Sequence, residues 1–106
     1  MSDKDPVDGR RPLEARLWGE VRFAHRGVAV EPTSQKSVAL LAYLAAAPGP
    51  SSREELAALL WGPGRLANVR QALYTLRSLP GAEEWLDAGA ATVNVLAVVD
   101  VVELTA

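Results

Sequence analysis

From residue 14 onward the chain alternates apolar and charged residues with a period of two, which is typical of a half-buried β-strand. The apolar positions are Ala15, Leu17, Val21 and Phe23, and the charged positions are Glu14, Arg16, Glu20 and Arg22. Gly19 interrupts the alternation and indicates a turn or a bulge. A turn follows at residues 25–27, and Val28 and Val30 then resume the alternation. The pattern predicts a short antiparallel meander.

The period then changes to that of a helix. Thr33 or Ser34 can cap its start, because a hydroxyl accepts a hydrogen bond from a free backbone N–H of the first turn. The apolar face comprises Val38, Leu41, Ala42 and Ala45. Pro48-Gly49-Pro50 ends this first helix.

A second, short helix is predicted from Ser52, which forms a capping box with Glu55. Its expected buried stripe comprises Leu56, Leu59 and Leu60. It breaks at residues 62–64, where the sequence is Gly-Pro-Gly.

A third helix is predicted over about residues 65–79, ended by Pro80-Gly81. Its expected core stripe comprises Leu66, Val69, Leu73 and Leu76. The opposite face carries Asn68, Gln71, Thr75 and Ser78, flanked by Tyr74, Arg70 and Arg77.

Two strands are expected at 84–87 and 92–95, joined by the loop 88–91, and the run LAVVDVVEL indicates a further strand. Residues 1–12 mix charge with proline and glycine and predict a disordered leader, which leaves 13–106 as one domain. The expected fold class is α+β.

A short helix, a glycine-containing turn and a longer polar-faced helix make a helix-turn-helix. In that motif the second helix lies in the major groove of DNA, where Asn and Gln can pair with adenine and Arg can pair with guanine. A β-hairpin directly after it would make the domain winged. A solvent-facing polar surface with no DNA partner accounts for the same pattern equally well.

The composition and charge of the chain limit the class of protein to which it can belong. Hydrophobic residues make up 49% of the 106 residues, enough for one buried core, and there is no cysteine. The net charge of −2 hides a polarised distribution: residues 53–82 carry Arg53, Arg65, Arg70 and Arg77, whereas residues 83–106 carry acids and no base. No apolar run is long enough to span a bilayer, and the N-terminus has no stretch suited to a signal peptide, so we expect a cytoplasmic location.

Nothing in the sequence favours catalysis, a cofactor or a metal site. The single histidine, His25, lies at a turn and is expected to be exposed, and no serine stands in a nucleophile-elbow context. Trp18, Trp61 and Trp85 are expected to anchor the core or a hairpin. We therefore predict a binding module that is not an enzyme.

The segments SREELAALLW and NVRQALYTLRSLPG resemble the DNA-binding domain of bacterial regulators that carry a transcriptional-activator (BTAD) domain. These are relatives of the Streptomyces antibiotic regulatory proteins, with a winged helix of the response-regulator (OmpR) type. RLWGEVRF, GVAVEP, KSVALLAYLAAAPG and ATVNV add weaker likenesses, so the resemblance covers about residues 14–104. It implies a three- or four-stranded N-terminal sheet, three helices and a C-terminal hairpin wing.

The resemblance also implies a DNA contact set. Groove-facing residues of the third helix would be Asn68, Gln71, Tyr74 and Thr75. Phosphate or base contacts would come from Arg65, Arg70 and Arg77, and contacts near the starts of the first two helices would come from Lys36 and Arg53. The chain departs from the family in its wing, residues 83–95, which is acidic and has no base.

The C-terminal run Val98, Val99, Val101, Val102 and Leu104 leaves two alternatives open. It is a candidate strand for a homodimer, because an apolar edge invites pairing, or it completes the domain's own sheet. The chain is correspondingly either a piece of a longer regulator or a stand-alone domain. The alternative to DNA binding is a winged helix used for protein–protein contact or homodimerisation.

Overall fold

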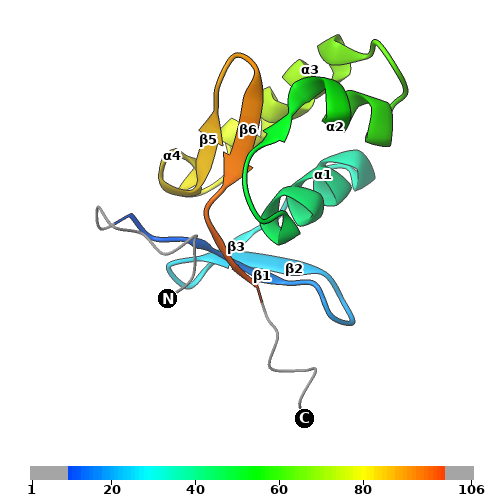
Figure 1. Ribbon diagram of the computed structural model, residues 1–106. Helices are drawn as coiled ribbons and strands as arrows, with labels where there is room; N and C mark the ends of the chain where they lie inside the picture. The colour runs from blue at the N-terminus through cyan, green and yellow to red at the C-terminus, as the bar shows by residue number, and fades with distance from the viewer. Residues whose placement is uncertain (1–9, 100–106) are drawn as a thin grey trace.

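A computed structural model describes residues 10–99, which form four helices and two small β-sheets (Figure 1). The fold is mixed α+β, as the sequence predicts. The predicted leader lies outside the described residues up to position 9, and so does the part of the valine run from Val101 onward. Within residues 10–99 no helix combines the length and the apolar character needed to cross a membrane.

The four-stranded sheet has the strand order β3-β2-β1-β7. Its strands are β1 (Leu13–Arg16), β2 (Arg22–His25), β3 (Val28–Val30) and β7 (Ala97–Val99). β1, β2 and β3 form the predicted antiparallel meander. β7 lies parallel to β1, with Leu13 opposite Ala97, so the first three residues of LAVVDVVEL after the leucine complete the domain's own sheet.

Three inward positions predicted in the meander are wrong or only partly right. β1 ends at Arg16, so Leu17 is half-buried and Val21 is exposed, because both lie in the loop that leaves the sheet. Val28 begins the edge strand β3 and is also exposed. Trp18 lies in the same loop as Val21 with 57% of its surface exposed, which corrects its prediction as an anchor.

The three longer helices follow the predicted order: α1 (Gln35–Ala46), α2 (Arg53–Leu60) and α3 (Leu66–Arg77). Ser34, and not Thr33, caps α1: its Oγ accepts a hydrogen bond from the backbone N–H of Ser37 at 3.1 Å. Ser52 caps α2 by accepting from the N–H of Glu55 at 2.9 Å. The hydroxyl half of the predicted capping box is therefore confirmed.

The second sheet has the order β4-β6-β5 and includes a strand pair that the sequence pattern missed. Its strands are β4 (Ser51–Ser52), β5 (Leu86–Ala88) and β6 (Thr92–Val95). The predicted strand 84–87 is wrong at its start, because Glu84 belongs to a short helix, α4 (Ala82–Trp85). The indole Nε1 of Trp85 donates to the carbonyl oxygen of Pro80 at 3.0 Å, so the buried indole closes this turn of helix.

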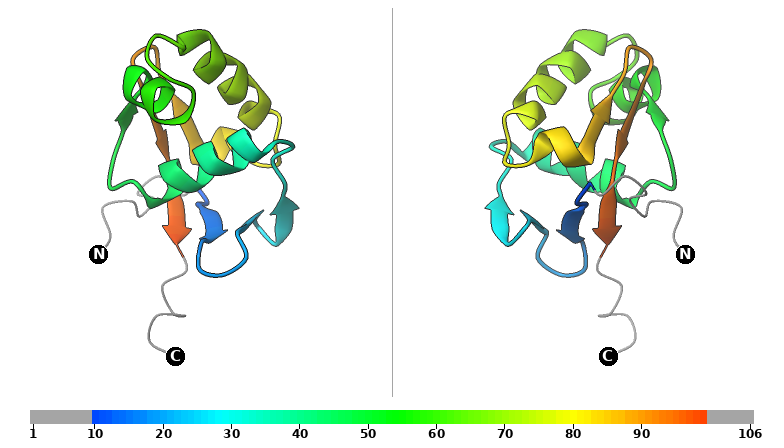
Figure 2. Two further views of the ribbon diagram at one scale, coloured as in Figure 1. Left: turned by 90° about the vertical axis from the view of Figure 1, so that its right-hand side faces the viewer. Right: turned by 90° about the vertical axis from the view of Figure 1, so that its left-hand side faces the viewer.

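α1 lies at the centre of the molecule, with the four-stranded sheet on one side and α2 and α3 on the other (Figures 1 and 2). Leu40, Leu41 and Leu44 of this helix are fully buried. Two predicted core leucines are exposed, Leu59 by 56% and Leu66 by 41%, because each stands near the α2–α3 turn at the rim of the helical layer. α2, α3 and the β5–β6 hairpin thus stand on the opposite side of α1 from the meander (Figure 1).

Candidate nucleic-acid interface

α3 is held against the core by one buried stripe, which leaves its other face in solvent. The buried residues are Val69, Ala72, Leu73 and Leu76. A tight turn connects α2 to α3, and within it Gly62 has a φ of +120° and Gly64 a φ of +78°. Residues with side chains rarely adopt such positive φ values, so this turn depends on glycine.

At about 100° of rotation per residue, Ala67, Gln71 and Tyr74 fall on the line of α3 opposite the buried stripe. Arg70 and Arg77 lie on one flank of that line, and Asn68 and Thr75 lie on the other. All of these except Thr75 are exposed, and Tyr74 is exposed by 73%. The polar face predicted for the third helix is therefore present on its solvent side.

Thr75 is the one groove candidate whose hydroxyl already has a partner within its own helix. Its Oγ1 donates to the carbonyl oxygen of Gln71 at 3.2 Å, and the residue is half-buried. The side chains of Asn68, Gln71 and Tyr74 make no hydrogen bond within residues 10–99. These three side chains offer donors and acceptors at the surface, whereas Thr75 offers its methyl group and one acceptor oxygen.

Lys36 has a structural role that the sequence did not suggest. Its ammonium group donates to the carbonyl oxygen of Leu60, the last residue of α2, and lies 5.9 Å from the centre of the Trp61 ring. A cation stabilises the C-terminal end of a helix, where backbone carbonyls lack partners. Lys36 thus ties α1 to α2, and its predicted DNA contact would have to share this position.

Arg53 and Arg77 both reach the hairpin loop, residues 88–91. Arg53 Nε donates to the carbonyl oxygen of Gly89 at 2.9 Å, and its backbone N–H donates to Ala91 at 3.0 Å. Arg77 Nη2 donates to the carbonyl oxygen of Ala88 at 3.3 Å. The loop is therefore bracketed by a guanidinium group from the first residue of α2 and another from the last residue of α3.

Arg65 and Arg70 are exposed, and neither makes an ion pair within the described part of the chain. Arg65 precedes α3 as its N-cap and contributes no side-chain capping bond. Arg65 thus stands at the start of α3, Arg70 and Arg77 lie on one flank of that helix, Arg53 lies next to the hairpin loop, and Lys36 lies on α1.

The acidity predicted for the wing is mostly located elsewhere. Glu83 and Glu84 lie in α4, at the end of β5 that is remote from the loop. With about 3.3 Å per strand residue, β5 separates them from the loop by roughly 10 Å. Of the acids predicted in the wing, only Asp87 stands in the hairpin itself.

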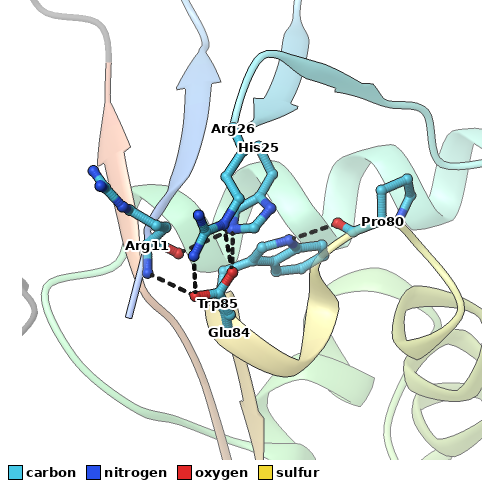
Figure 3. Close-up of polar contacts among 6 residues, drawn as sticks. All are labelled: Arg11, His25, Arg26, Pro80, Glu84 and Trp85. Carbon is cyan, nitrogen blue, oxygen red and sulfur yellow. Dashed lines mark hydrogen bonds and ion pairs between the residues drawn. The ribbon is translucent and has the colours of Figure 1, made fainter. Parts of the chain in front are cut away.

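A second polar cluster lies around α4, at the end of β5 that is remote from the hairpin loop, and was not predicted (Figure 3). The carboxylate of Glu84 accepts from Arg26 Nε at 2.8 Å and Nη2 at 2.9 Å, and from the backbone N–H of Arg11 at 3.2 Å. His25 Nε2 lies 3.3 Å from the same carboxylate. The hydrogen bonds from Arg26 are the main reason that the pKa of Glu84 falls to about 2.

His25 is not the exposed turn residue that the sequence predicts. Only 4% of it is exposed, its Nε2 lies 3.2 Å from the carbonyl oxygen of Arg11, and its ring packs directly on Gly81. These partners stand far from it in the sequence, so no local signal could reveal them. The cluster joins the β2–β3 turn to α4 by contacts between segments that are distant in the sequence, so we assign it a role in stabilising the fold.

Comparison with known proteins yields no match: no protein-family model, no curated protein and no solved structure matches the chain. The resemblance to the transcriptional-activator regulators thus stays a prediction from the residues quoted above.

Proposed function

We propose that the chain binds duplex DNA in a sequence-specific manner and acts as a transcriptional regulator in the bacterial cytoplasm. In this proposal the fold is a winged helix-turn-helix: α2 and α3 form the helix-turn-helix, and the β5–β6 hairpin is the wing. α3 lies in the major groove, while the start of α2 meets the phosphate backbone. Double-stranded DNA is the partner, and no cofactor is required.

One observation carries this proposal, which is the outward face of α3. Asn68, Gln71 and Tyr74 are exposed there, and their side chains have no hydrogen-bonding partner in the described part of the chain. The exposed guanidinium of Arg70 lies on the flank of the same face. Amide side chains can make paired hydrogen bonds to adenine, and arginine can do so to guanine. The four buried residues on the other side hold this face rigidly, which favours reading of base edges.

The charges next to this face support the same partner. Arg53, Arg65, Arg70 and Arg77 lie on or beside α2 and α3, and carbonyl oxygens are the only partners of Arg53 and Arg77 within residues 10–99. Each lysine or arginine that neutralises a phosphate releases counterions and steepens the dependence of affinity on salt. With about four such groups per chain, we expect micromolar or weaker binding by a single domain.

The test begins with selection of duplexes from a random library, followed by fluorescence anisotropy titrations of the best duplex at two salt concentrations. Arg70→Ala should weaken binding and flatten the salt dependence by about one unit of slope. Gln71→Ala should change the selected sequence more than the affinity for random DNA. Arg22→Ala, which removes an exposed arginine of β2 from the far side of the molecule, is the matched control and should bind normally.

Absence of binding at any salt concentration would contradict the proposal. A second function, homodimerisation or contact with another protein, is favoured by the position of β7 at the end of its sheet. One edge of β7 has no neighbouring strand among the described residues, and Val98 is exposed by 55%. Light scattering that shows a stable dimer, together with no DNA binding, would favour this second function.

A further inference from the structure

We propose that the hairpin loop, residues 88–91, forms a binding site for DNA phosphates together with Arg53 and Arg77, and that this wing does not enter the minor groove. The inference rests on the proposed DNA binding and specifies how the wing takes part in it. The positively charged side chains of the site come from α2 and α3, and the backbone carbonyls of the loop hold them in place.

The geometry brings the two guanidinium groups to neighbouring carbonyls. Arg53 binds the oxygen of Gly89 at 2.9 Å, and Arg77 binds that of Ala88 at 3.3 Å. The backbone N–H of Arg53 also donates to Ala91, which fixes the start of α2 to the far end of the loop. The two guanidinium bonds span 36 residues of the sequence for Arg53 and 11 residues for Arg77.

Both arginines keep N–H donors that could bind a ligand. A guanidinium has five N–H groups in a planar fork. Arg53 uses Nε on the loop, which leaves both Nη groups, and Arg77 uses Nη2, which leaves Nε and Nη1. A carbonyl oxygen carries no net charge, so each arginine keeps its positive charge, and neither forms an ion pair with a carboxylate among residues 10–99. A fork that retains its charge and two free donor atoms fits a phosphodiester.

The loop itself excludes the usual mode of a wing. Its sequence is Ala-Gly-Ala-Ala, so no side chain extends beyond a methyl group. The minor groove is about 7.5 Å deep, and reading its floor requires a long side chain such as arginine. A loop whose side chains are no larger than a methyl group does, however, let the phosphate backbone approach closely. The loop is therefore suited to contact the backbone and unsuited to insertion into the groove.

The position of the acids is consistent with this site. Glu83 and Glu84 lie at the other end of β5, and Glu84 is neutralised there by Arg26. Asp87 stands one residue before the loop and is the nearest acid of the hairpin. The loop end of the hairpin thus combines two arginines with Asp87, while Glu54 and Glu55 follow Arg53 in the first turn of α2.

The experiment uses the full chain and the duplex chosen by selection. Arg53→Gln removes the charge but keeps an N–H in the place of Nε that can donate to the carbonyl oxygen of Gly89. Arg77→Gln removes the charge and also the bond to Ala88, because that bond comes from Nη2, which glutamine lacks. The slope of log affinity against log salt is negative, and each variant should make it shallower by about 0.9. The double variant should make it shallower by about 1.8. The selected sequence should stay the same. Arg53→Lys should keep the slope with weaker binding, because lysine lacks the fork.

Entry into the minor groove is tested separately with duplexes in which inosine replaces guanine at the flanks of the site. Inosine removes only the 2-amino group that projects into the minor groove, so the affinity should not change. A changed affinity, or unchanged salt slopes in both glutamine variants, would overturn the inference. If the natural chain binds and Arg70→Ala weakens it while the glutamine variants do not, the wing site alone fails. If the natural chain binds no duplex, the proposed function fails as well.

Discussion

The imidazole ring of His25 fills the space in which a side chain at position 81 would begin. A Cβ on Gly81 would overlap with Nδ1 and Cε1 of that ring, and Gly81 itself has a φ of +72°. The β2–β3 turn therefore packs against the start of α4 through direct contact between a ring and a backbone. Only glycine satisfies both the contact and the backbone conformation.

Gly81→Ala should lower the free energy of unfolding by about 3 kcal/mol, because overpacking adds to the cost of a positive φ. Urea unfolding followed by tryptophan fluorescence measures this change. Gly64→Ala is the matched control, since Gly64 has a φ of +78° with nothing within 4 Å of its Cβ position, and it should cost about 1 kcal/mol. Equal losses in the two variants would show that the contact with His25 contributes nothing.

The carboxylate of Glu84 should make stability depend on pH in the acid range. Its pKa is lowered to about 2 in the folded state, so the ionised form is favoured by folding. The stabilisation is complete above the ordinary glutamate pKa of about 4.5 and disappears as the pH falls towards 2. We expect Glu84→Gln to remove this part of the pH dependence, as measured by urea unfolding from pH 6 to pH 2.

Glu83→Gln is the control for that series, because Glu83 is the exposed neighbour on the same short helix. It should leave the difference in stability between pH 6 and pH 2 close to that of the natural chain. If Glu84→Gln and the natural chain lose stability in parallel over this range, the ion pair with Arg26 does not contribute.

The two candidate caps of α1 can be separated by single substitutions. Ser34→Ala should cost about 1 kcal/mol, since it removes the oxygen that accepts from the N–H of Ser37. Thr33→Ala should change the free energy of unfolding by less than about 0.5 kcal/mol, because Thr33 is exposed and caps nothing. Thermal or urea unfolding distinguishes these outcomes, and a larger loss for Thr33→Ala would contradict the assignment.

The stripe on α3 gives a fourth prediction. Leu73→Ala should cost about 3 kcal/mol, because the side chain is 2% exposed and its removal leaves a cavity. Leu66→Ala, 41% exposed on the same helix, should cost less than about 1 kcal/mol. Urea unfolding of the two variants tests which residues of α3 belong to the core. Comparable losses in the free energy of unfolding would show that Leu66 is a core residue.

Local chemistry was enough to predict the three longer helices, one of the caps and the meander, but not α4. A capping serine, a proline-glycine stop and a repeat of apolar residues act within one or two turns, so Ser52 and residues 80–81 were readable directly. The exposed face of α3 follows from the same periodicity. The positions of Leu59 and Leu66 were not readable, because a leucine near the end of a helix is buried only if a neighbouring element covers it.

The parts of the candidate site that were missed depend on contacts between distant segments. Arg53 meets the hairpin loop 36 residues away, and Arg26 meets Glu84 at a separation of 58 residues. Composition showed acids in the C-terminal quarter, but only the fold shows that α4 holds Glu84 away from the loop. Charge along the sequence was therefore a poor guide to charge on the surface of the hairpin.

The parallel pairing of β1 with β7 has a consequence for how the chain acquires its structure. Leu13 and Ala97 are neighbours in the sheet, although nearly the whole described chain separates them in the sequence. Contacts of such high order slow folding, because the entropy of closing a long loop is lost before the contact forms. During synthesis on the ribosome, the edge of β1 that pairs with β7 would stay unpaired until Val99 had left the exit tunnel. The helical core is thus expected to assemble first and the sheet to be completed last.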